Sequence, residues 1–183
     1  MRPFFAFPLL AALFLAISGP SFAEEKKDDL LTDQQFGRAL TMFLEDPLHE
    51  KGPELAKVLI IFTMQTPKAA VMLGESEMKW IGKKDDKRGL LLFAAYLGGN
   101  TRSQLLSGVK QNDRYSGLVT LFAVYQRLQG KDKEFKIAEV DELRKLHADG
   151  KLLAHVVEME KKMPTKLSPD DEKALKDLLN DKK

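Results

Sequence analysis

Apolar residues recur at every third or fourth position along most of this chain, and no stretch of useful length alternates apolar with polar residues. The apolar runs are short, and most of them end at a glycine or a proline, residues that terminate helices. We therefore predict an all-α fold: a single domain of about eight or nine short helices packed as helical hairpins over residues 32–180. Residues 24–31 are expected to form a flexible lead-in and residues 181–183 a frayed tail.

The helix boundaries are predicted from capping residues, glycines and prolines. Thr32 begins the first helix, Gln35 completes a capping-box pattern, and Asp46-Pro47 ends it. A short helix is predicted over 68–73, and Ser76 is expected to cap a second short piece through Ile81. Further helices are predicted over 54–65, 89–97 ending at Gly98-Gly99, 101–109 capped by Asn100 or Thr101, 113–129 capped by Asn112-Asp113 and ending at Gly130, 137–148 ending at Gly150, 151–162 and 168–180.

Residues 54–65 are apolar nearly all round the expected helix, which predicts burial on every side and a central place in the core. The β-branched run at 58–61 also fits a buried strand. A helix is favoured because Pro53 and Glu54 are typical of a helix start, and because no partner strand is evident elsewhere.

Two apolar segments resemble each other: residues 93–96 read Phe-Ala-Ala-Tyr and residues 122–125 read Phe-Ala-Val-Tyr, at a spacing of 29 residues. A period of this length is typical of solenoid proteins. The pattern has only two copies and no matching turn residues. A solenoid-like arrangement therefore stays open as an alternative to simple hairpins.

The first 23 residues have the three-part layout of a secretory signal peptide. Arg2 is positive, residues 4–17 are apolar, and small residues at Ser21 and Ala23 fit the cleavage site. The apolar run is shorter than the ~20 residues that span a bilayer, which argues against an uncleaved anchor. We expect cleavage after Ala23, export to the periplasm or the extracellular space, and no stable membrane span afterwards.

Composition excludes several classes of protein. With 29 Lys and Arg against 27 Asp and Glu, the chain lacks the positive field that holds nucleic acid, so no nucleic-acid partner is predicted. The absence of cysteine excludes disulfides, cysteine-ligated zinc, iron–sulfur clusters and thiolate catalysis. We predict no cofactor.

No motif indicates a catalytic or metal site. His49, His147 and His155 do not have a metal-binding spacing. His155 and Glu158 share a helix face and His147 precedes them, but the reversal at Gly150 need not bring the three together. The chain also lacks a GxSxG nucleophile elbow and a phosphate-binding glycine loop. No catalytic residue and no metal ligand is predicted.

Two polar segments, 100–104 and 111–115, are the strongest candidates for a binding site. Arg102 and Arg114 could hold a carboxylate or phosphate with two hydrogen bonds each, and Tyr115 could stack or donate a hydrogen bond. The alternative is structural: each arginine caps a helix end or pairs with an acid such as Asp113.

We expect these two segments to lie at opposite ends of the domain, because a helix of about nine residues would separate them by ~14 Å. Trp80, the only tryptophan, would anchor a protein partner if exposed, although a core position is the alternative. The candidate binding residues are therefore Trp80, Arg102, Asp113, Arg114 and Tyr115.

These observations favour a non-enzymatic exported module that binds another exported protein or a peptide in a groove between helices. The oligomeric state stays open. One alternative is a carrier that holds an apolar small molecule among Ile61, Phe93 and Phe122. The other is an enzyme without a recognisable motif that uses Arg102, Asp113 or His155.

Overall fold

The computed structural model describes residues 31–74 and 87–161. These ranges contain six helices and no strand, which confirms the all-α fold class. The predicted number of eight or nine helices and the solenoid-like arrangement are not confirmed. The predicted signal peptide, Trp80 and the helices expected at 76–81 and 168–180 lie outside the described residues. The helices are α2 (Asp33–Glu45), α3 (Gly52–Gln65), α5 (Lys87–Ser107), α6 (Arg114–Lys131), α7 (Ala138–Ala148) and α8 (Leu152–Lys161).

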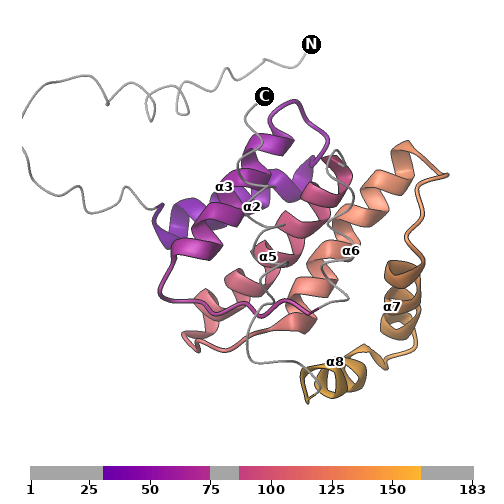
Figure 1. The fold of residues 1–183 in the computed structure, drawn as a ribbon. Helices are drawn as coiled ribbons and strands as arrows, with labels where there is room; N and C mark the ends of the chain where they lie inside the picture. The colour runs from indigo at the N-terminus through magenta and orange to yellow at the C-terminus, as the bar shows by residue number, and fades with distance from the viewer. Residues whose placement is uncertain (1–30, 75–86, 162–183) are drawn as a thin grey trace, which may run out of the picture.

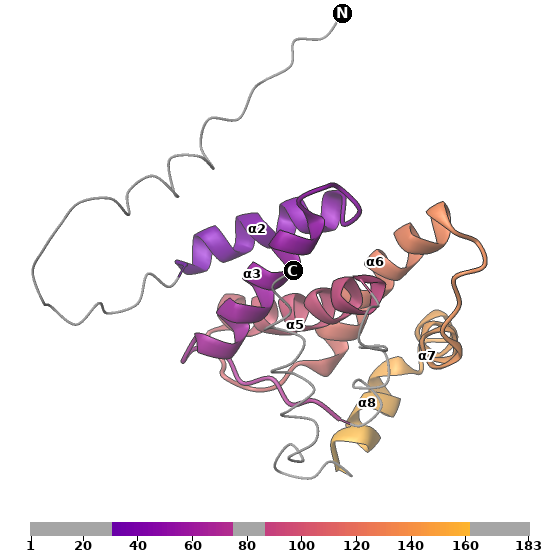
Figure 2. The ribbon, with the colours of Figure 1, turned by 45° about the horizontal axis from the view of Figure 1, so that its top comes forward.

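Helix α5 is the central element of the described domain. It lies between α3 and α6 in both views, while α7 and α8 lie beyond α6 (Figures 1 and 2). Helix α2 packs mainly on α3, where the rings of Phe36 and Phe62 stack with their centroids 4.4 Å apart. Because α5 is covered on two sides, eleven consecutive residues from Leu91 to Thr101 are buried.

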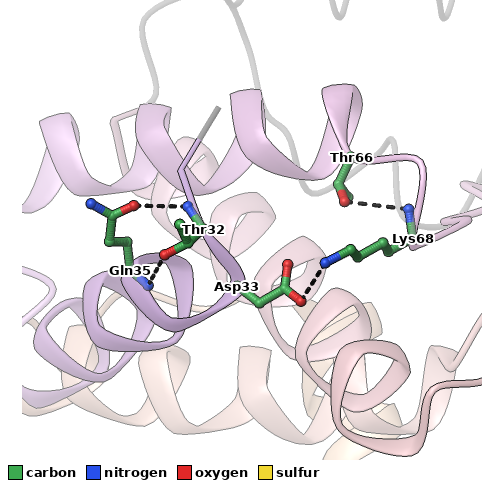
Figure 3. Close-up of polar contacts among 5 residues, drawn as sticks. All are labelled: Thr32, Asp33, Gln35, Thr66 and Lys68. Carbon is green, nitrogen blue, oxygen red and sulfur yellow. Dashed lines mark hydrogen bonds and ion pairs between the residues drawn. The ribbon is translucent and has the colours of Figure 1, made fainter. Parts of the chain in front are cut away.

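The first two helices form as their local sequence predicts. The Thr32 hydroxyl accepts the backbone N–H of Gln35, and the Gln35 side chain accepts the backbone N–H of Thr32, so the capping box is complete (Figure 3). Residues 58–61 are helical, which excludes the strand alternative. The predicted burial of α3 on every side is wrong: Ile61 is 45% and Met64 50% exposed.

The prediction of two helices separated by Gly98-Gly99 is wrong, because α5 continues through both glycines to Ser107. Both are packing positions. A Cβ on Gly98 would lie 2.7 Å from Leu40 Cδ1, and a Cβ on Gly99 would lie 2.6 Å from the backbone oxygen of Ser116. The glycines therefore allow α2 and α6 to approach α5 closely, and the next residue, Asn100, is fully buried instead of capping a helix.

The helix predicted over 68–73 is also wrong, since residues 69–74 follow an irregular path without helix. The Gln104 side chain donates to the Ala70 carbonyl at 3.0 Å and accepts the Ala70 N–H at 2.8 Å. Asn112 Oδ1 accepts the N–H of Met72 at 3.0 Å. Backbone groups that a helix would pair within itself thus bind side chains of α5 and of the α5–α6 loop.

The second half of the domain follows its predicted boundaries with one exception. Asp113 caps α6, and Gly150, at φ +70°, follows the end of α7. Gly130 was expected to end α6 but lies inside it. None of the six described helices combines the length and apolar character needed to cross a bilayer.

The two similar segments, 93–96 and 122–125, lie on the paired helices α5 and α6. Tyr96 and Tyr125, which end the two segments, are both fully buried. A Cβ on Gly117 would lie 2.9 Å from the Tyr96 ring, so α6 approaches α5 closely here as well. Both segments are therefore buried in the same helical hairpin.

Candidate functional site

The polar segments 100–104 and 111–115 lie side by side, and the expectation that they occupy opposite ends of the domain is wrong. Helix α5 runs two turns past Asn100, and the loop after it turns back along α5. Asn100 Nδ2 donates to Asn112 Oδ1 at 2.9 Å, and Asn100 Oδ1 accepts the backbone N–H of Asp113 at 3.0 Å. One buried asparagine therefore joins both segments.

Asp113 holds the first turn of α6. Its carboxylate accepts the backbone N–H of Ser116 at 2.9 Å, the Ser116 hydroxyl at 2.7 Å and the Ser103 hydroxyl at 2.5 Å. Burial alone would raise the pKa of Asp113, but the hydrogen bonds from Ser103 and Ser116 outweigh it and lower the pKa below its ordinary value. These contacts make Asp113 an ionised helix cap that joins α5 to α6.

Arg114 and Tyr115 also contact the protein itself. Arg114 is 1% exposed, and its Nη1 lies 3.9 Å from the sulfur of Met159 on α8. Tyr115 is half-buried, with its ring edge-on to His147 at 6.0 Å between centroids. A hollow of about 300 Å³ lies beside them, with Asp113 and Glu160 in its lining. The buried guanidinium faces the interior and is not offered to solvent.

Arg102 lies elsewhere, on the exposed side of α5, where it lines a groove of about 720 Å³ between α2 and α5. We call this the α2–α5 groove. Most of the exposed surface that lines the groove is apolar, although polar residues contribute to it. The residues are Asp33, Gln34, Phe36, Gly37, Arg38, Thr41, Met42, Glu45, Arg102, Leu105 and Leu106.

The shape of the groove depends on Gly37. A Cβ built on this residue would meet no atom within 4 Å, so the α2 wall is open at this point. Met42 on the same helix is 38% exposed, and Leu106 on α5 is 77% exposed. An opening flanked by exposed apolar side chains from two helices is typical of a site that binds an apolar surface.

Charges surround the groove unevenly. Asp33, at one end of α2, forms an ion pair of 2.8 Å with Lys68 in the segment after α3 (Figure 3). Arg38 and Arg102 stand on different helices, and among the described residues neither guanidinium makes a hydrogen bond or an ion pair. Glu45 lies seven residues beyond Arg38, or about 10 Å along the helix axis.

Among residues 31–74 and 87–161, no group of three histidine or acidic side chains is placed to hold a metal ion. His147 instead packs against Phe122, with 5.8 Å between ring centroids. Of the residues suggested for an apolar cavity, Phe93 and Phe122 are buried, whereas Ile61 is 45% exposed.

The sequence indicated only one member of the groove, Arg102. Gly37, Arg38 and Met42 share one face of an amphipathic helix, a spacing that the sequence displays. The sequence does not show that Leu106 lies on the same surface as these residues. Leu106 reaches that surface because α5 continues past Gly98-Gly99.

Comparison of the chain with known proteins found no matching family model, no matching curated protein and no matching solved structure.

Proposed function

We propose that this protein is an exported, non-enzymatic module that binds a segment of another protein in the α2–α5 groove. The observation that carries the proposal is a groove whose α2 wall is open at Gly37 and whose lining includes the exposed side chains of Met42 and Leu106. Export is inferred from the signal-peptide layout of residues 1–23.

The dimensions of the groove favour a helical segment as its occupant. The α2 side extends from Asp33 to Glu45, a rise of about 18 Å, which matches about three turns of a partner helix. Such a helix would place apolar side chains at i, i+3, i+4 and i+7 over the groove. Replacing Gly37 with a residue that has a large side chain should therefore fill the opening and exclude the partner.

The test is selection of binders from a displayed library of random peptides of about 16 residues with the chain lacking residues 1–23. We expect enriched peptides with apolar residues at helical spacing, and we expect Gly37→Leu to abolish their binding because leucine fills the opening. The matched control is Gly130→Leu on α6, another helical glycine whose Cβ would meet no atom within 4 Å. Peptides that bind the Gly37→Leu protein as well as wild type would refute the proposed site.

A further inference from the structure

We infer that the α2–α5 groove selects an acidic amphipathic segment, with a carboxylate of the partner placed against Arg38 and Arg102. This inference rests on the proposed function and adds the chemistry of the partner. Its basis is the pair of exposed guanidinium groups that line one groove from two different helices.

Two of the other described arginines have clear structural partners. Arg88 forms an ion pair of 2.8 Å with Asp132, and Arg144 donates to Gln129 at 2.9 Å. The guanidinium groups of Arg38 and Arg102 make no such contact within the described part of the chain. Their donors are therefore available to a ligand in the groove, and a planar guanidinium matches a carboxylate with two parallel hydrogen bonds.

The remaining charges give the site a polarity. At one end of the groove, Lys68 neutralises Asp33 through their ion pair. The positive charges of Arg38 and Arg102 are therefore not offset by Asp33. Glu45 stands about 10 Å beyond Arg38 on the other side. A partner helix with an acidic residue over the arginines and a basic residue about two turns away would complement both charges. Apolar residues between them would lie over Gly37 and Met42.

The same peptide library separates this inference from the proposed function. We expect wild-type protein to enrich Asp or Glu at a fixed place within the apolar pattern. We expect Arg38→Gln with Arg102→Gln to keep the apolar pattern and lose the acidic preference. The control is Arg127→Gln, an exposed arginine of α6 outside the groove, which should leave the preference unchanged.

A second measurement uses one enriched peptide and its Glu→Gln analogue. Exposed ion pairs are individually weak, so we expect the analogue to bind about three- to tenfold more weakly, with the difference shrinking as salt rises from about 0.05 to about 0.5 M. The double arginine variant should bind both peptides alike. Equal binding of both peptides to wild type would overturn the inference while leaving the proposed function intact. If no peptide binds in a Gly37-dependent way, both fall.

Two other occupants give different results. If the groove joins two copies of this chain, wild type will sediment as a dimer and Gly37→Leu as a monomer, with no peptide selected. If it contacts a lipid surface, vesicles containing phosphatidylglycerol will sediment wild type but not the double arginine variant. Either result would overturn the assignment to an acidic peptide.

Discussion

The Gln104 side chain binds both backbone polar groups of Ala70, a residue 34 positions earlier in the chain, with hydrogen bonds of 2.8 and 3.0 Å. Its amide also donates to Asn100 at 2.7 Å, so one side chain connects α5 to the segment that follows α3. Gln104 is 2% exposed, which means that water cannot replace these contacts easily.

We expect Gln104→Leu to lower the free energy of unfolding by about 1–3 kcal/mol, because the N–H and C=O of the partly buried Ala70 lose their partners. Urea denaturation measures the loss, and hydrogen exchange should show faster exchange at the Ala70 amide. Gln126→Leu, on the exposed side of α6, is the control and should change stability by less than about 0.5 kcal/mol. Unchanged exchange at Ala70 would contradict the role given to Gln104.

Gly99→Ala tests the close packing of α5 on α6. The new Cβ would overlap the Thr120 hydroxyl and would lie 2.6 Å from the backbone oxygen of Ser116, so backbone must move. We expect a loss of about 1–3 kcal/mol or more in thermal or urea unfolding. Gly130→Ala, with open space around it, should instead gain up to about 1 kcal/mol. If Gly99→Ala left the free energy of unfolding unchanged, α5 and α6 would have to lie further apart than the structure places them.

Asp113 makes stability depend on pH. The pKa of its carboxyl is lower in the folded chain than in the unfolded chain, so its ionisation contributes stability above the unfolded value of about 4. That contribution is lost as the pH falls through the folded pKa. Asp113→Asn should therefore be less stable than wild type at pH 7, and the difference should shrink below about pH 4.

Urea titrations from about pH 7 to about pH 3 measure this change. Asparagine is also a good N-cap residue, so the variant retains much of the helix start and isolates the effect of the charge. Asp149→Asn is the control, because Asp149 is an exposed aspartate at the end of α7. A difference between wild type and Asp113→Asn that stays constant with pH would contradict the ionised cap.

Gly37→Ala is expected to raise stability by about 0.5–1 kcal/mol, because alanine favours the helix and the new methyl group meets no atom. Thermal unfolding measures the gain. A loss of stability would mean that the opening is filled in the folded chain. The same measurement on Gly37→Leu shows that loss of peptide binding by that variant does not come from unfolding.

Features decided by neighbouring residues were predictable from the sequence. The capping box at Thr32 and Gln35 and the cap at Asp113 need only residues within one helical turn, and the structure contains each of them. The left-handed Gly150 that ends α7 is equally local. The all-α fold class follows from the spacing of apolar residues, which is again a local property.

Features decided by residues far apart in sequence could not be predicted from the sequence. Gly98-Gly99 looks like a helix end in sequence, and only the presence of Leu40 and Ser116 beside it shows why α5 needs two residues without side chains there. The segment 69–74 has a helical pattern that Gln104 and Asn112 override. The groove was missed for the same reason, since the residues that line its two walls are more than 50 positions apart in the sequence.

The bonds from Gln104 to Ala70 also bear on the order of folding. Helices α5 and α6 are consecutive and joined by a short loop, so their contacts close with a small loss of chain entropy. Gln104 and Asn112, which hold the backbone of residues 70 and 72, both lie on that hairpin, so we expect this segment to dock after the hairpin forms. We therefore expect substitutions in the α5–α6 contact, such as at Leu118, to slow folding, and Gln104→Leu chiefly to speed unfolding.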